Sequence, residues 1–429
     1  MRSLRYFLSA LFFCTLTIHL VAQDGRTAIL VEKMVDVVAG KLIENKTIVV
    51  EGGNITDILS GKSTKNYDTL IDLSGYTVLP GLIDCHTHLT DASYDKSIDV
   101  YETPIAAWGI LGVIHAKATL EAGFTTVRDV GGDFYADVAL RDAINKHWVP
   151  GPRMFVSGKA LTITGGHGHW ANWMAPQFDV LPNPGNPVDG VDEVLKRTRT
   201  LIRNNVDLIK INATGGFGSS RSLPGASSFS IEEMKTAVDE ANKRGLRVAA
   251  HAHGTDGIKN AIAAGVHSIE HGTFLNEESI QLLKANDIFL VMDLLAAYAS
   301  LIEQNEDISD KGMNMNNREA YDDFAANFKK AHEAGVKMAF GTDASIFRHG
   351  RNAEQFKLMH DAGMRPDDIL RTATINAAAL IGIEKRTGSL EKGKWADLIA
   401  VKGDPLQQIE VLEKVHFVMK AGKVYKTPE

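Results

Sequence analysis

Two histidines separated by one residue, His86 and His88, are the first side chains of this chain whose spacing suggests chemistry. They lie in the segment LIDCHTHL, which has the composition of a β-strand. Side chains two apart on a strand point to the same face, so both imidazoles would face one way and could bind one metal ion. The alternative is a pair of polar surface residues, because an isolated H-x-H motif is weak evidence for a metal site.

Three more side chains of the metal-binding type stand at the ends of other apolar runs. His251 ends RVAAH, His271 ends SIEH and Asp343 ends MAFGTD. For any one of the histidines the alternative is a hydrogen-bonded core residue. That alternative does not account for a set of ligand-type side chains at the ends of several strands, where barrel enzymes build their active sites.

Lys210 is a lysine in the middle of an apolar run, VDLIKINATGG, with Ile209 and Ile211 on either side. A buried ammonium costs several kcal/mol unless it is paired or chemically changed. Burial also lowers the pKa of the amine and favours its neutral form. The alternative is a core lysine in a salt bridge with Asp84 or Asp207.

These residues lie on a repeated pattern of short apolar runs followed by helical segments. The runs that we predict as strands are 76–89, 124–132, 152–158, 206–216, 246–254, 266–275, 288–294 and 336–345. One helical segment begins with a capping box, Ser230 with Glu233, and ends at Gly245. The alternation predicts an α/β protein with a (β/α)8 TIM barrel over residues 78–383. A doubly wound open sheet is the alternative, but it does not predict ligand-type residues at so many strand ends.

The two flanks of the chain do not follow this repeat. Residues 27–59 read as strand, turn and strand with no long helix, and residues 388–406 and 415–426 look the same. We therefore predict a small two-part β domain made from residues 23–77 and 384–429.

The first 22 residues have the pattern of a secretory signal peptide. Arg2 and Arg5 precede an apolar run without acidic residues, and Ala22 is the expected last residue before cleavage. The alternative is a retained membrane anchor, but the run is short for a span and is interrupted by Ser9, Thr15, Thr17 and His19. The pattern predicts export to the periplasm or secretion, with no membrane attachment after cleavage.

The composition excludes some partners. The net charge of the 429-residue chain is −7, and removal of residues 1–22 lowers it to −9, so no basic stripe indicates nucleic acid. That removal also leaves Cys85 as the one cysteine, so no internal disulfide is expected. A large core or a bound metal must then supply cohesion. The sequence leaves a homo-oligomer open.

Several segments, in order, resemble the amidohydrolase superfamily: GLIDCHTHL, IKI with TGG, AAHAHG, IEHG, GTDAS, AT with NAA, and KWADLIAV. The resemblance extends from Thr27 to Lys426. It is nearest to the imidazolonepropionase-like branch, which includes metal-dependent prolidases and related Xaa dipeptidases. It implies a (β/α)8 barrel with a two-part β domain.

The resemblance also implies a pair of divalent metal ions, with zinc as the expected metal. By position in the family motifs, the ligands fall on His86, His88, Lys210, His251, His271 and Asp343. The family's lysine is carboxylated, so Lys210 would react with CO2 and bridge the ions as a carbamate. In this arrangement His86, His88 and Asp343 hold one ion, and His251 and His271 hold the other.

The implied activity is metal-dependent hydrolysis of a non-cyclic amide bond, in a dipeptide or an N-acyl amino acid. A hydroxide shared by the metal ions attacks the carbonyl, and Asp343 passes a proton to the leaving nitrogen. Cyclic amidase activity, as in imidazolonepropionase, and lactonase activity are the alternatives. A non-catalytic scaffold is a different class, which the complete ligand set disfavours. Deamination is disfavoured because His253 stands where deaminases carry a glutamate.

Four side chains are candidates for substrate contact. His167 and His169 lie in TGGHGHW after the third predicted strand, and Arg221 could bind a carboxylate through two hydrogen bonds. His253 shares a strand face with His251 and could support it. The alternatives are a loop packed on itself and a solvated arginine. Arg128 and Asp129 are predicted to form an internal ion pair.

Overall fold

The computed structural model describes residues 25–95, 102–175, 187–219, 221–313 and 315–428. The predicted signal peptide, residues 1–22, lies outside these ranges. Within them, no helix is both long and apolar enough to cross a membrane.

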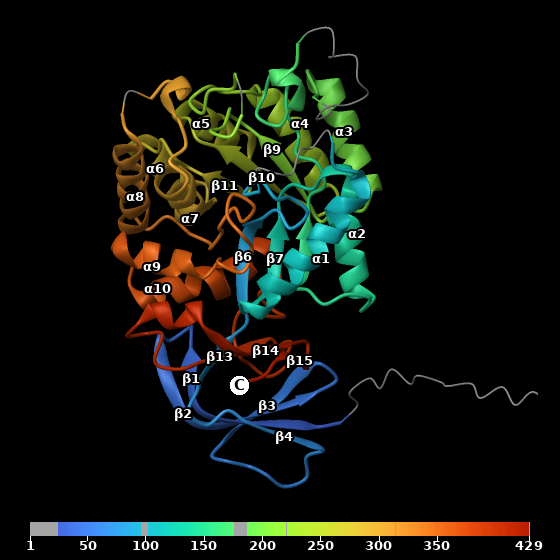
Figure 1. Ribbon diagram of the computed structural model, residues 1–429, viewed down its shortest axis with the longest axis vertical. Coiled ribbons are helices and arrows are strands. Elements are labelled where there is room, and N and C mark those ends of the chain that lie inside the picture. Colours follow the sequence, from blue (N-terminus) through green and yellow to red (C-terminus); the bar gives the residue numbers. More distant parts are fainter. Residues whose placement is uncertain (1–24, 96–101, 176–186, 220, 314, 429) are drawn as a thin grey trace, which may run out of the picture.

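One sheet is built from both ends of the chain and lies below the rest of the molecule in Figure 1. Its strand order is β15-β14-β13-β5-β1-β2-β3, and β4 pairs with β1. The pairing of β5 with β13 joins the N-terminal and C-terminal halves. The strands are β1 (Thr27–Asp36), β2 (Lys41–Glu51), β3 (Asn54–Ser60), β4 (Thr69–Asp72), β5 (Thr77–Pro80), β13 (Leu398–Val401), β14 (Val415–Lys420) and β15 (Lys423–Lys426).

The middle of the chain forms two parallel sheets, in the orders β6-β7-β8 and β12-β11-β10-β9. Their strands are β6 (Leu82–Thr87), β7 (Phe124–Asp129), β8 (Arg153–Val156), β9 (Leu208–Asn212), β10 (Arg247–Ala252), β11 (Ser268–His271) and β12 (Phe289–Val291). The helices are α1 (Ile105–Glu121), α2 (Ala136–Asn145), α3 (Val191–Arg203), α4 (Ile231–Asn242), α5 (Thr255–Ala264), α6 (Glu277–Ala285), α7 (Leu294–Tyr298), α8 (Asn317–Glu333), α9 (Glu354–Asp361), α10 (Pro366–Arg371) and α11 (Ala377–Ile381).

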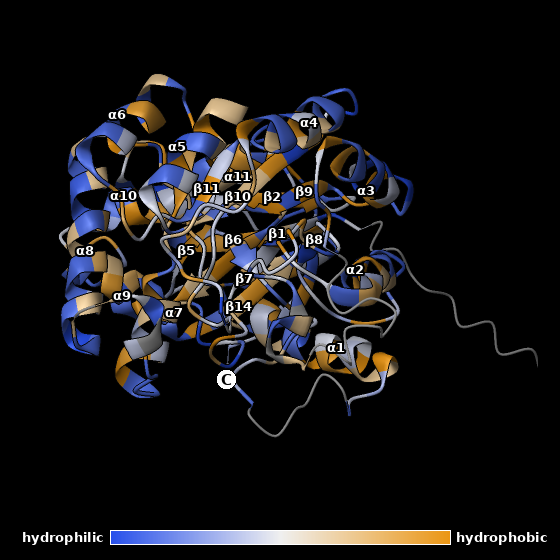
Figure 2. Cartoon of the chain, turned by 90° about the horizontal axis from the view of Figure 1, so that it is seen from above, coloured by the Kyte–Doolittle hydropathy of each residue, from blue (hydrophilic) through white to orange (hydrophobic). Residues whose placement is uncertain are grey.

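Backbone hydrogen bonds link these two parallel sheets at both of their edges. The amide of Asp207 donates to the carbonyl of Val156 at 2.7 Å, next to the β8–β9 edge. At the other edge, residues 336–345 bond first to β12, through Leu290, and then to β6, through Cys85 and His86. Seen from above, strands β6 to β11 lie at the centre and helices surround them, with blue hydrophilic residues toward the outside (Figure 2).

Two of the predicted strands differ from the structure. The predicted strand 76–89 divides at Gly81: β5 joins the terminal sheet, and β6 joins a parallel sheet. Thr125 packs so closely that a Cβ at Gly81 would lie 2.2 Å from its Oγ1, so only glycine fits at this bend. Residues 336–345 form isolated bridges rather than a strand, because the amide of Phe340 donates to the carbonyl of Thr372 and Asp343 adopts a left-handed φ of 55°.

The helices pack on the strands through a large apolar core. Phe124, Phe340 and Phe356 stack in it, with ring centroids 4.5–6.3 Å apart. Helix α4 begins after Ser230 with the predicted capping box to Glu233. The terminal sheet has a separate core that includes Ile29, Ile48, Val78, Leu398 and Phe417. The parallel strands are therefore held on their outer faces, and polar side chains are left for their inner faces and ends.

Candidate metal centre

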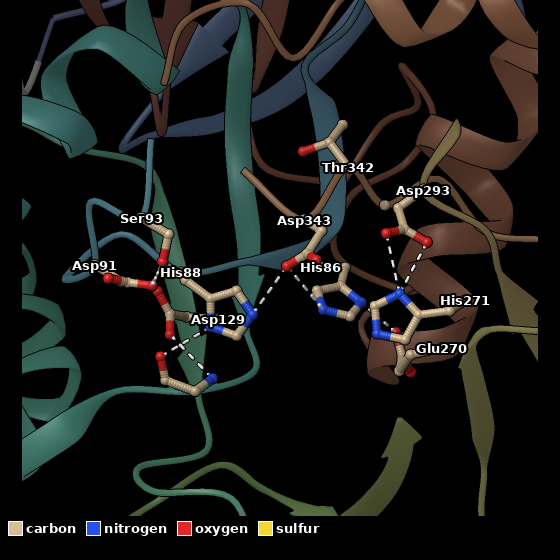
Figure 3. A network of polar contacts seen from close by, with 12 residues as sticks. His86, His88, Asp91, Ser93, Asp129, Glu270, His271, Asp293, Thr342 and Asp343 are labelled. Carbon is tan, nitrogen blue, oxygen red and sulfur yellow. Dashed lines mark hydrogen bonds and ion pairs between the residues drawn. The ribbon is translucent and has the colours of Figure 1, made fainter. Parts of the chain in front are cut away.

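Five of the predicted metal-binding residues come together in space. Four of them lie at or just after the carboxyl ends of parallel strands, and Asp343 lies in the segment that bridges β12 and β6. The potential ligand atoms of His86, His271 and Asp343 lie within 4.8 Å of one another, and so do those of His251, His253 and His271. His271 belongs to both groups and therefore lies between them (Figure 3 shows the first group). The separation of these residues along the chain is large, so this gathering is a product of the parallel strands.

His86 and His88 direct the same ring nitrogen toward one carboxylate. The Nε2 atoms of His86 and His88 lie 3.4 and 3.1 Å from Oδ1 of Asp343. The Nδ1 atoms are held elsewhere: that of His86 lies 3.0 Å from Glu270 Oε2, and that of His88 lies 3.0 Å from the Gly131 carbonyl. Since an acceptor at Nδ1 keeps its proton there, Nε2 is the nitrogen of each ring that faces Asp343 and that a metal ion could bind.

The other histidines are oriented in the same way by their neighbours. Nδ1 of His271 lies 2.9 Å from Asp293 Oδ1, and Nε2 of His251 lies 2.9 Å from the Gly215 carbonyl. Nδ1 of His253 lies 2.7 Å from the Thr273 hydroxyl. Each imidazole therefore keeps one nitrogen anchored and one nitrogen for the shared space.

Two of these residues have an unusual backbone conformation. The φ angle is 70° at His271 and 55° at Asp343, which is the left-handed region that side chains other than glycine rarely adopt. Such strain persists only where the surrounding structure enforces it, and it concentrates at functional sites. Here it turns the side chains at the strand ends into the common space.

The electrostatics fit a divalent cation. Burial, followed by the proximity of other histidines, lowers the pKa of His251 and His271 well below its usual value, so both rings are neutral at pH 7. Burial also lowers the pKa of His253. Although burial opposes ionisation of Asp343, His86 and His88 hold its pKa well below the usual range. Neutral imidazoles and an ionised carboxylate are the protonation states that metal binding needs.

Lys210 lies on β9 with only 3% of its surface exposed. Burial lowers its pKa to about 8, even though the charges of Glu270 and Asp343 act in the opposite direction. The carboxylates of the alternative salt bridges have other partners. Asp207 accepts from Arg141 at 2.7 Å, and Asp84 accepts from Thr342 at 2.6 Å. Lys210 is therefore a buried amine with a larger neutral fraction at pH 7 than an exposed lysine has.

The predicted ion pair between Arg128 and Asp129 is wrong. Neighbouring residues of a strand point to opposite faces, so the two side chains separate. Arg128 instead donates to both carboxylate oxygens of Glu270 at 2.8 Å, and Asp129 accepts from the amide of Leu89 at 2.7 Å. Glu270 is fully buried. Its carboxylate contacts both Arg128 and His86.

Of the four predicted substrate contacts, His167 and His253 lie against the predicted metal ligands, whereas no hydrogen bond or ring contact among the described residues links His169 or Arg221 to those ligands. His167 stacks on His251 with ring centroids 4.2 Å apart, and His253 stacks on His271 at 4.6 Å. Nδ1 of His169 accepts from the amide of Gly165, inside its own loop. Arg221 is exposed and adopts a φ of 56°.

Glu270 and Asp293 are site residues that were not predicted from the sequence. Both stand beside predicted strand ends, in SIEH and VMD, which is the signal that could have pointed to them. A carboxylate that anchors a metal-binding histidine is a common partner in metalloenzymes.

Comparison with known proteins identifies the family of this chain. The sequence profile of the amidohydrolase family matches residues 77–425. A solved Xaa-Pro dipeptidase with bound methionine in its active site has 37% identity over 94% of this chain and 100% of its own, with a TM-score of 0.86. Ochratoxinase of Aspergillus niger is 34% identical over 375 residues, which cover 82% of this chain and 76% of that protein. Imidazolonepropionase of Thermoplasma acidophilum is 21% identical over 409 residues, covering 92% of this chain and 91% of that protein.

The family match and the similar mixed α/β structures define a metal-dependent hydrolase. The chain belongs to the amidohydrolase family. It is a metal-dependent enzyme that hydrolyses an amide bond.

Proposed function

We propose that this enzyme uses two divalent metal ions, zinc by preference, to cleave a non-cyclic amide bond in a dipeptide or an N-acyl amino acid. The observation that carries the proposal is the convergence of imidazoles with anchored nitrogens around the Asp343 carboxylate and the shared His271. Burial lowers the pKa of His251, His253 and His271, so that neutral ring nitrogens face this shared space.

The residues divide between the two ions as follows. His86, His88 and Asp343 would hold one ion, and His251 and His271 the other, with Lys210 between them as a carbamate. The low pKa of the Lys210 amine supports its reaction with CO2. Metal ions in such a pair activate water and polarise the substrate carbonyl.

Asp343 is the proposed proton carrier. Its carboxylate is ionised and borders both His86 and His88, so it can accept a proton from the attacking water. It can then deliver that proton to the leaving nitrogen, as general acid–base catalysis requires. His167 and His253 would contact the substrate, and their stacking on the proposed ligands supports this role.

The similar proteins support a substrate in which the cleaved amide bond adjoins an amino acid. One of them is described as a Xaa-Pro dipeptidase with methionine in its active site, and another is named ochratoxinase. The more distant likeness to imidazolonepropionase supports cyclic amide hydrolysis as the second candidate. A lactone is a third substrate for the same site, and a hydrolysis screen over dipeptides, N-acyl amino acids, cyclic amides and lactones separates them.

Substitution of the lysine tests the metal assignment. Lys210→Ala should lose both metal, measured by elemental analysis, and hydrolytic activity. Lys420→Met is the matched control, because Lys420 is also buried but bonds to the Gly151 carbonyl next to the terminal sheet. Normal metal content with full activity in Lys210→Ala would refute the assignment.

We further propose that the parallel strands close into a (β/α)8 barrel over residues 78–383. The hydrogen bonds at both edges of the two parallel sheets support this closure. The terminal sheet would be a separate small domain from residues 23–77 and 384–429, although β5 straddles that boundary. Cleavage after Ala22 and export remain proposals that the N-terminal sequence alone supports.

A further inference from the structure

We propose that an apolar surface beside the histidines binds a large apolar or aromatic side chain of the substrate. We call it the apolar wall. It consists of the partly exposed side chains Phe217, Tyr298, Ile302, Met313 and Met315. This inference rests on the proposed amide hydrolase function, and it adds the class of side chain that the site selects.

Phe217 connects the wall to the candidate metal centre. Its ring meets His253 edge to face, with centroids 5.0 Å apart, and lies 6.3 Å from Phe274. The wall is backed by a buried apolar cluster: Leu301, Ile308, Ala320 and Tyr321. A substrate held near His253 therefore meets hydrocarbon and aromatic surface on this side.

The loop that carries Phe217 is fixed against the same histidines. A Cβ at Gly216 would lie 2.3 Å from Nδ1 of His167, so the ring of His167 rests directly on this backbone. The Ser219 hydroxyl contacts Nδ1 of His167 at 2.6 Å and donates to the carbonyl of His167 at 2.7 Å. Lys311 donates to the Ser219 carbonyl at 2.9 Å, which ties this loop to the segment that carries the methionines.

That segment lies between α7 and α8 and contains two short helical turns, Ala299–Glu303 and Ser309–Lys311, with the methionines close to its end. Its apolar side chains Ile302, Met313 and Met315 pack on the same buried cluster as Phe217 and keep part of their surface exposed. Methionine adapts its shape to different apolar groups, which suits a surface that accepts several related side chains.

A dipeptide series tests the proposal. The set carries Gly, Ala, Leu, Met or Phe on either side of the scissile bond. For the wild-type enzyme, kcat/KM should rise with apolar size on one side of the bond. Phe217→Ala should lower kcat/KM for the Phe and Leu substrates by about tenfold or more, through a higher KM, and change it less than about twofold for Gly substrates. Met315→Ala should cause the same selective loss to a smaller degree. This variant replaces Phe217→Ala in the test if Phe217→Ala does not fold.

Trp148→Ala is the control. Trp148 is 73% exposed and lies before β8, at the strand end opposite the histidines, so its loss should leave the profile unchanged. An equal loss for all substrates in both wall variants, or no size dependence in the wild type, would overturn the proposal. If the wild type cleaves none of these amides, the proposed substrate class fails instead. Calorimetry then still tests the wall. Free phenylalanine should bind more tightly than free glycine to the wild type, and this preference should be lost in Phe217→Ala.

Discussion

Glu270 contacts two side chains, Arg128 and His86, and has a different role toward each. It neutralises the buried guanidinium of Arg128 and accepts a hydrogen bond from Nδ1 of His86. Arg128 also donates to the Cys85 carbonyl at 2.6 Å and the Ser268 hydroxyl at 2.9 Å, so the ion pair joins β6, β7 and β11. The position of His86 thus depends on an ion pair behind it.

Glu270→Gln should weaken metal binding and stability together. The amide no longer neutralises Arg128, and breaking a buried pair lowers the free energy of unfolding by about 3–5 kcal/mol. Loss of the anchoring carboxylate should reduce metal affinity roughly 10–100-fold, measured by competition with a chelator. An unchanged metal affinity would show that His86 needs no anchor. Asp397→Asn, which breaks a buried pair far from the histidines, is the control for a general loss of stability.

His88 makes metal binding pH dependent. Burial lowers the pKa of His88, but the hydrogen bond and charge of Asp343 outweigh burial and raise it to about 9. Below pH 9 a metal ion must displace a proton from this ring. Metal affinity should therefore rise by about tenfold per pH unit from pH 6.5 toward pH 9 and then level off. Chelator competition at several pH values measures this slope, and His88→Ala should flatten it; an equal slope in that variant would contradict the assignment.

Glycines decide how closely the loops approach the imidazoles. Gly216 and Gly218 lie in one loop after β9 and differ in their surroundings. A Cβ at Gly216 would meet the ring of His167, whereas a Cβ at Gly218 meets nothing within 4 Å. The loop therefore touches the ring of His167 at Gly216 and has free space around Gly218.

Gly216→Ala should displace His167 and lower kcat/KM by about tenfold or more, since small misplacements of contact groups have large effects on rate. Gly218→Ala should stay within about twofold of the wild type. Steady-state kinetics on one amide substrate compares the two variants. Equal effects in the two would mean that the position of His167 is irrelevant to the reaction.

A buried ion pair joins the terminal sheet to the parallel strands. Arg153 of β8 donates to Asp397 at 2.7 Å and stacks on Trp395 with 3.7 Å to the ring centroid. Asp397 is fully buried and also accepts from the amide of Ala421 at 2.7 Å. This contact couples the stability of the two parts.

Asp397→Asn should lower the free energy of unfolding by about 3–5 kcal/mol, because Arg153 loses its counter-charge in a largely buried place. Unfolding in urea, followed by circular dichroism, measures the change. Metal content and kcat should stay at wild-type values below the unfolding transition. If the urea midpoint of Asp397→Asn equals that of the wild type, the terminal sheet contributes nothing to the stability of the parallel strands.

The ligand-type residues at strand ends could be predicted because they depend on local rules. Alternation along a strand puts His86 and His88 on one side, and apolar runs mark where each strand ends. Parallel strands then bring their carboxyl ends to one edge whatever the exact register. For the same reason the capping box at Ser230 and the β character of the chain ends were visible in the sequence.

The partners of those residues were decided by the tertiary structure alone. His86 and Glu270 are 184 residues apart, and their contact depends on which strands lie opposite each other. The ion-pair partner of Arg128, the division of a predicted strand at Gly81 and the inward turn of His271 through a positive φ all depend on packing between distant segments. Local sequence determines what each strand end presents, whereas contacts between strands determine which atom each side chain meets.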